Sequence, residues 1–132
     1  MILLDTHALI WFLQRPEAFG SIAKRQLQDN FATGQLSVSV ISYWEIGLLV
    51  HKGRIGLDVS PIRFREMAIE RGISECPLDG RVALEAAALD LHPDPADRFI
   101  VATALAHTAT LVTADEKILG WAGPLLRQDA RL

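Results

Sequence analysis

Residues 94–119, DPADRFIVATALAHTATLVTADEKIL, give the clearest sign of the fold class. The proline at position 95 suits the first turn of a helix, and the apolar run after it predicts a helix over 94–107. Residues 110–113, TLVT, are rich in β-branched side chains and predict a strand, which is followed by a helical turn over 116–119. A strand between helices, joined by short loops, is typical of a parallel sheet covered on both faces.

The same alternation continues along the rest of the chain. We expect further strands at residues 1–4, 36–40, 73–77 and 125–126, and helices at residues 8–13, 21–31, 42–51, 60–71 and 80–91. The second of these helices is amphipathic, with Ile22, Leu27 and Phe31 roughly on one side. The sequence predicts a single α/β domain over residues 1–132, a three-layer α/β/α sandwich around a central parallel sheet.

Composition limits the classes of function. The 132 residues are 50% hydrophobic and carry a formal net charge of −3, from 13 basic and 16 acidic residues. Because the chain has no basic excess, an anionic substrate would have to be reached through a bound cation or a local basic edge. The single cysteine, Cys76, excludes an internal disulfide and a multi-cysteine metal site. The high apolar content indicates either an unusually complete core or a partner that covers part of the surface.

The apolar start of the chain, MILLDTHALIWFL, raises the question of a signal peptide. It has no basic leader, and Asp5 and His7 interrupt the run, so a signal peptide is not expected. No stretch approaches the ~18 uninterrupted apolar residues of a membrane span. We therefore expect a soluble, cytoplasmic protein with no membrane partner.

Acidic residues stand directly after the expected strands or near the start of the helices that follow them. They are Asp5, Glu45, Asp94, Asp97 and Asp115. Because the carboxyl ends of parallel strands lie along one edge of a sheet, and ligands bind there, we expect these acids to converge. Each acid also has a simpler interpretation as a helix cap. Ser42 and Glu45 fit a capping box, and Asp94 before Pro95 fits an N-cap followed by a first-turn proline.

Capping accounts less well for the whole set. Asp97 is not needed as a cap if Asp94 caps the helix, and Asp5 follows a continuous apolar strand, where an unpaired carboxylate is costly. Clustered carboxylates repel one another unless a cation lies among them, and Arg98 and Lys117 are the only basic residues on these loops. All-oxygen ligands suit Mg²⁺ or Mn²⁺, and such an ion typically activates water and braces a phosphate in phosphodiester hydrolysis. The four widely spaced histidines are interpreted as surface or helix-end residues, with His7 as an exception because it adjoins Asp5.

Four segments, LLDTHALIWFL (3–13), SYWEIGLL (42–49), HPDPADRFIVATAL (92–105) and LVTADEKI (111–118), occur in this order over nearly the whole chain. Together they resemble the PIN domain and, more closely, the VapC-type toxins of type II toxin–antitoxin pairs. The resemblance implies an α/β/α fold around a parallel sheet and Mg²⁺- or Mn²⁺-dependent endoribonuclease activity on RNA. It also implies a cognate antitoxin protein that silences the enzyme.

In the matching motifs, four acids take the catalytic and metal-binding roles: Asp5, Glu45, Asp97 and Asp115. Asp94 is then expected to cap its helix, while Asp97 binds metal. Thr6 and Thr113 lie beside the acids and are expected either to hold ligands or water, or to make only local hydrogen bonds in turns. Arg98 is expected either to contact a phosphate or an acidic group, or to be a solvated surface residue.

Other functions stay open on the sequence. A non-catalytic PIN-like module would bind an antitoxin or RNA without chemistry. A Mg²⁺-dependent phosphatase of the haloacid-dehalogenase type needs D-x-D after the first strand, but His7 stands at the second position. A phospho-receiver domain needs paired acids there, although Asp79 offers a later aspartate.

The aromatic residues have two interpretations. Trp11, Tyr43 and Trp44 either stack on RNA bases or belong to the core or a dimer interface. The second interpretation, together with the apolar helices, predicts a homodimer. The antitoxin would cover the acidic edge, inserting an arginine among the carboxylates.

Overall fold

The computed structural model describes residues 1–132. Five strands form one sheet in the order β3-β2-β1-β4-β5, and every neighbouring pair is parallel. The strands are β1 (Ile2–Leu4), β2 (Leu36–Ser39), β3 (Ser74–Cys76), β4 (Thr110–Thr113) and β5 (Arg127–Asp129).

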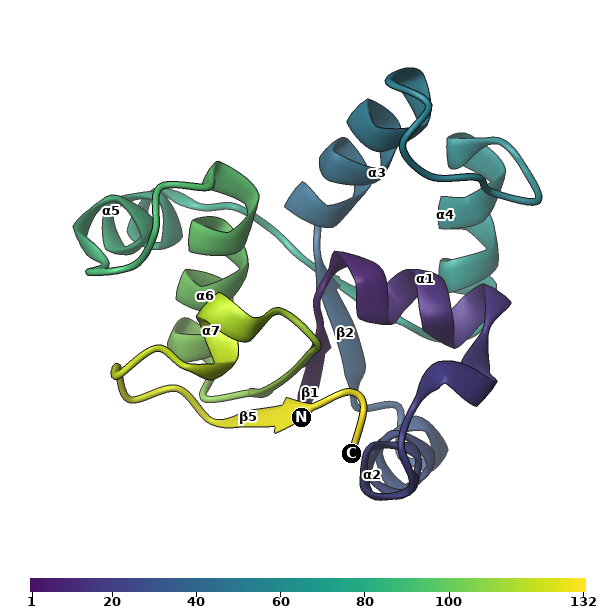
Figure 1. Ribbon diagram of the computed structural model, residues 1–132, viewed down its shortest axis with the longest axis horizontal. Coiled ribbons are helices and arrows are strands. Elements are labelled where there is room, and N and C mark those ends of the chain that lie inside the picture. Colours follow the sequence, from purple (N-terminus) through teal and green to yellow (C-terminus); the bar gives the residue numbers. More distant parts are fainter.

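Seven α-helices and one 3₁₀ turn connect the strands. They are α1 (Thr6–Gln14), the 3₁₀ turn η1 (Pro16–Ala18), α2 (Ser21–Ala32), α3 (Ile41–His51), α4 (Pro61–Glu70), α5 (Gly80–Ala88), α6 (Pro95–His107) and α7 (Glu116–Leu119). Figure 1 shows the sheet between two groups of helices, with α1 to α4 on one side and α5 to α7 on the other. The predicted three-layer α/β/α sandwich is confirmed.

The central strand supplies side chains to both layers of the core. Ile2 and Leu4 pack in the larger cluster with α1, α2 and α4, whereas Leu3 points to the opposite face and packs against α6. This alternation follows from the two-residue period of a strand. It explains why a strand buried on both faces consists of apolar residues alone.

Most elements begin and end within two residues of the prediction, as where α1 begins at Thr6 rather than residue 8, and three details differ more. The last strand lies at Arg127–Asp129 rather than 125–126, because the polar segment RQD pairs with β4 at the sheet edge while Leu125 packs into the core. Helix α5 ends at Ala88, since Leu89 leaves the helix in an extended conformation. On α2, Ile22 and Phe31 are 54% and 45% exposed, and the core face consists of Ala23 and Leu27.

The strand order places a ligand-binding edge beside β1. From β1 the chain first adds β2 and β3 on one side of the sheet, and later β4 and β5 on the other. The crevice outside the carboxyl ends of strands at such a reversal is where open α/β sheets bind ligands. Asp5 follows β1 and Asp115 follows β4, so both lie at this crevice. None of the helices has the length and apolar character needed to cross a membrane.

Candidate active site

Asp5 combines a capping role with a buried position at the sheet edge. Its Oδ1 accepts a hydrogen bond from the amide of Ala8 at 2.8 Å, so Asp5 caps α1 as expected. Its Oδ2 accepts a hydrogen bond from the hydroxyl of Thr113 at the end of β4. The residue is only 7% exposed, and this burial raises the pKa of the Asp5 carboxyl, with a smaller contribution from Asp115.

The two threonines tie together the elements that carry the acids. Thr113 donates to Asp5 and, through the same oxygen, accepts from the amide of Asp115 at 3.0 Å. The buried hydroxyl of Thr6 donates to Ser42 Oγ at 3.0 Å and so links α1 to α3. Thr113 therefore holds an acid in place and also makes a local hydrogen bond in its turn, whereas Thr6 joins two helices.

Glu45 is not part of a capping box, and that interpretation was wrong. Helix α3 begins at Ile41, and its N-cap residue, Val40, makes no side-chain cap. The amide of Ile41 is instead bound by Ser39 Oγ at 3.2 Å, and the hydroxyl of Ser42 receives the bond from Thr6. The Glu45 carboxylate is left without a local partner on its own helix and lines the cavity described below.

Asp94 and Asp97 divide the roles at the start of α6. Asp94 Oδ1 accepts from the amide of Asp97 at 3.0 Å, so Asp94 caps the helix as predicted. The Asp97 carboxylate caps nothing, and its Oδ2 lies 2.7 Å from Nε2 of His92. Burial raises the pKa of Asp97 to about 6, opposed by the contact with His92 and reinforced by Asp94, Asp115 and Glu45.

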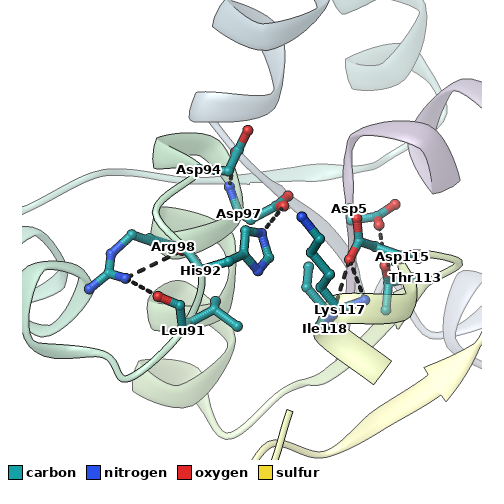
Figure 2. A network of polar contacts seen from close by, with 10 residues as sticks. All are labelled: Asp5, Leu91, His92, Asp94, Asp97, Arg98, Thr113, Asp115, Lys117 and Ile118. Atoms are coloured by element: carbon teal, nitrogen blue, oxygen red, sulfur yellow. Dashed lines mark hydrogen bonds and ion pairs between the residues drawn. The ribbon is translucent and has the colours of Figure 1, made fainter. Parts of the chain in front are cut away.

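Asp115 caps the short helix α7. Its Oδ1 accepts from the amides of Lys117 and Ile118 at 2.9 and 3.0 Å (Figure 2). Because a carboxylate has two oxygens, this cap leaves Oδ2 free for another contact.

These acids meet at one cavity of about 360 Å³ at the carboxyl edge of the sheet. Its lining consists of Asp5, Thr6, His7, Trp11, Glu45, Asp94, Asp97, Ala114 and Asp115. A second cavity of about 600 Å³ shares part of this wall and adds His92, Glu116, Lys117 and Arg131. The structure thus brings together five acids that the sequence spreads over more than 100 positions.

The donor set fits a hard divalent cation in chemistry, although its side chains are not yet arranged around one. No three histidine, cysteine, aspartate or glutamate side chains are close enough to form a complete metal-binding group. Carboxylate oxygens are nevertheless the ligands that Mg²⁺ and Mn²⁺ prefer. Burial raises the pKa values of the Asp5 and Asp97 carboxyls, and the negative charge of Asp115 raises both pKa values further. A bound cation would relieve this repulsion between carboxylates.

Two residues near the acids have roles that the sequence did not reveal. His92, interpreted as a surface or helix-end residue, is only 17% exposed at its side chain and contacts Asp97. Arg98 is half-buried and not free to meet a phosphate, because its guanidinium donates to main-chain carbonyls at the end of α5 and in the loop that follows. The spacing of His92 five residues before Asp97 was visible in the sequence, but the turn that brings them together was not.

The comparisons with known proteins agree with this architecture. The model of the PIN domain matches residues 2–122. The chain belongs to the PIN-domain family. Ribonuclease VapC22 of Mycobacterium tuberculosis is 30% identical to this PIN chain over 119 residues, which are 89% of this chain and 88% of that protein. The resemblance to VapC-type proteins drawn from the four sequence motifs is therefore confirmed.

Solved structures show the same PIN fold. A toxin–antitoxin complex from Klebsiella pneumoniae aligns with a TM-score of 0.66 and 21% identity over 98% of both chains. VapBC2 from Rickettsia felis, bound to a DNA fragment from its promoter, aligns with a TM-score of 0.71 and 18% identity over 97% of this chain and 98% of that one. FitAcB from Neisseria gonorrhoeae aligns with a TM-score of 0.59 and 25% identity over 89% of both chains.

Proposed function

We propose that this PIN-domain chain is a Mg²⁺- or Mn²⁺-dependent endoribonuclease and the toxin of a toxin–antitoxin pair. One observation carries the proposal: Asp5, Glu45, Asp97 and Asp115, from four separate elements, line a single cavity at the carboxyl edge of the sheet. The similarity to Ribonuclease VapC22 supports RNA as the substrate. The similarity to toxin–antitoxin complexes supports an antitoxin as the partner.

Each acid contributes to the site in a different way. Asp5 and Asp115 are fixed by their helix caps and offer carboxylates at the ends of β1 and β4. Asp97 offers Oδ1, while its Oδ2 faces His92. Glu45, which no cap holds, can turn toward the other three. When bound there, a divalent cation would lower the pKa of an attacking water and stabilise negative charge on the departing oxygen of the phosphodiester.

The cavity can receive a polyanion only if its own charge is offset. The acids that line it outnumber the basic residues, so an RNA phosphate would be repelled without a cation. The same charge suits an antitoxin that inserts an arginine among the carboxylates, since a guanidinium pairs well with carboxylate oxygens. On this proposal, the antitoxin arginine competes for the acidic cavity with the metal ion and the RNA that the ion binds.

A homodimer is part of the proposal. Helix α3 carries apolar residues around its whole circumference, and its Trp44 is 51% exposed. An exposed tryptophan on such a helix is typical of an interface. Light scattering on the purified chain measures the oligomeric state, and co-purification with the product of an adjacent small gene tests the antitoxin.

The deciding experiment is cleavage of a mixed set of structured RNAs, tRNAs included, by purified protein. Reactions contain Mg²⁺, Mn²⁺ or EDTA, and the variants are Asp5→Asn, Asp97→Asn and the control Asp29→Asn, which changes an exposed aspartate of α2. We expect metal-dependent cuts from the wild type and the control, and none from the two site variants. Cleavage that persists in EDTA or in both site variants would contradict the proposal and leave a non-catalytic module that binds antitoxin or RNA.

A further inference from the structure

The loop between α5 and α6 is organised by one arginine. The guanidinium of Arg98 donates to five main-chain carbonyls, over distances of 2.5 to 3.3 Å. The acceptors belong to Ala86, Ala87, Leu89, Leu91 and His92. They include carbonyls from the last turn of α5 and from the segment that enters α6, so a single side chain spans the whole connection.

Only arginine can make this set of contacts. A guanidinium offers five N–H donors in one rigid plane, whereas a lysine ammonium offers three on a compact centre. The carbonyls at the end of a helix have no partners within the helix and need donors from elsewhere. Arg98 supplies them at the end of α5 and at the same time fixes the backbone of Leu91 and His92.

The segment held by Arg98 carries the ring that contacts Asp97. His92 Nε2 lies 2.7 Å from Asp97 Oδ2, while the Nδ1 atom of the same ring is buried and has no hydrogen-bond partner. The ring therefore has one polar anchor, and its position otherwise depends on the backbone of His92. With Asp97 ionised, Nε2–H donates to the carboxylate and the proton is absent from Nδ1, which leaves only an acceptor unpaired.

Asp97 and Arg98 are neighbours on α6 with divergent side chains. Figure 2 shows Asp97 directed toward His92, on the side where Asp5 and Asp115 lie, and Arg98 directed away from them toward Leu91. A path of contacts thus runs from Arg98 through the backbone at 91–92 to the His92 ring and back to the Asp97 carboxylate. Hydrogen-bonded partners of a metal-binding carboxylate or histidine commonly set its orientation, and their loss costs about 10- to 100-fold in metal affinity.

We propose that Arg98 and His92 are positioning residues of the acidic site: Arg98 fixes the 87–92 segment so that His92 holds Asp97 Oδ2 and leaves Oδ1 for a divalent cation. This inference rests on the proposed function for its metal, but the positioning itself is a property of the metal-free chain. Both residues act through Asp97.

The first test is a double-variant cycle read by calorimetric titration with Mn²⁺ in the absence of RNA. Arg98→Lys keeps the charge and the stem but cannot reach five carbonyls, and His92→Gln removes the ring while leaving the carbonyl of residue 92 in place. We expect each to weaken Mn²⁺ binding about tenfold, and the combination to be no weaker than either alone. The matched control is Arg65→Lys, which loosens a guanidinium bound to the carboxylate of Glu75, and neither residue lines the acidic cavities. Wild-type affinity in Arg98→Lys, or effects that add in the double variant, would overturn the proposal.

The second test reads the His92 ring without metal. In EDTA at pH 8, the ring-nitrogen signals of His92, assigned by their loss in His92→Gln, should show a single Nε2–H tautomer in the wild type. In Arg98→Lys the two signals should move toward each other as the ring becomes free to reorient. Pro93→Gly loosens the same segment without changing Arg98, and it should have the same effect if Arg98→Lys does not fold. If a variant that folds shows the same His92 signals as the wild type, the positioning role is refuted. A wild type with the expected signals but no Mn²⁺ binding would refute only the proposed function.

Discussion

Replacing Asp97 with asparagine should stabilise the metal-free protein at neutral pH. The pKa of this carboxyl rises from 3.8 to about 6 on folding, mainly because of burial and then because of Asp94, Asp115 and Glu45. At about 1.36 kcal/mol per pKa unit, this rise corresponds to at most about 3 kcal/mol against the ionised form in the folded state. Since 20% of the side chain remains exposed, screening by solvent reduces the effect to about 1–2 kcal/mol.

The sign of the pH dependence follows from the direction of the shift. A carboxyl whose pKa is raised by folding binds its proton more tightly in the native state, so protonation stabilises the fold. For Asp97 this contribution is complete below pH 3.8 and is lost as the pH rises through about 6. Asparagine has the same shape, can accept from His92 and does not titrate. The Asp97→Asn variant should therefore match the wild type near pH 4 and exceed it above pH 6.

Urea unfolding in EDTA at pH 4, 5, 6 and 7.5, followed by tryptophan fluorescence, measures this difference. The expected gain at pH 7.5 is about 1–2 kcal/mol, or about 3–8 °C in Tm for a chain of this size. The control Asp29→Asn, at an exposed position of α2, should show no such trend. In saturating Mn²⁺ the order should reverse, because the wild type gains a ligand that the variant lacks. An Asp97→Asn variant no more stable than the wild type at pH 7.5, or equally favoured at pH 4, would refute the electrostatic reasoning.

Three further outcomes are expected. At 100 times its Kd, Mn²⁺ should stabilise the wild type by about 2.7 kcal/mol and the Glu45→Gln variant by less. If scanning fluorimetry shows no rise in Tm with Mn²⁺, this result would argue against a metal site. Thr113→Val removes the donor to buried Asp5 and should cost about 1–3 kcal/mol in urea unfolding; a cost near zero would mean that this hydrogen bond does not hold the carboxylate. Trp44→Asp should halve the mass measured by light scattering while leaving the circular dichroism spectrum unchanged, and an unaltered mass would place any dimer interface elsewhere.

The fold was predictable from the sequence because its elements are locally consistent. Strand β1 is a continuous apolar run and α6 begins with Asp94 and Pro95, so period, cap and proline all indicate the same boundaries. Strand β5 was misplaced because its sequence, RQD, has no strand character of its own and depends on pairing with β4. Such an edge strand is specified by its neighbour, and its own residues give no local signal.

The site was predictable only in part, for a related reason. Side chains at the carboxyl ends of parallel strands converge by topology, so the sequence order alone places Asp5 and Asp115 together. The contact of His92 with Asp97 depends on the path of a loop that Arg98 fixes through backbone carbonyls. Backbone carbonyls occur at every position, so a side chain that recognises them leaves no pattern in the sequence.

One aspartate before a helix can serve both as its cap and as a metal ligand. Asp5 caps α1 through Oδ1 and turns Oδ2 to Thr113, and Asp115 caps α7 through Oδ1 alone. A carboxylate has two oxygens, so at Asp115 the cap fixes the group while the second oxygen remains available at the strand edge, whereas at Asp5 the second oxygen is itself held by Thr113. The cap also reduces the entropy that a later ligand would have to remove, because the side chain is already ordered. Helix caps at the end of β1 and β4 are therefore a way to build a rigid acidic site, and only the acids that cap nothing, Glu45 and Asp97, need other means of orientation.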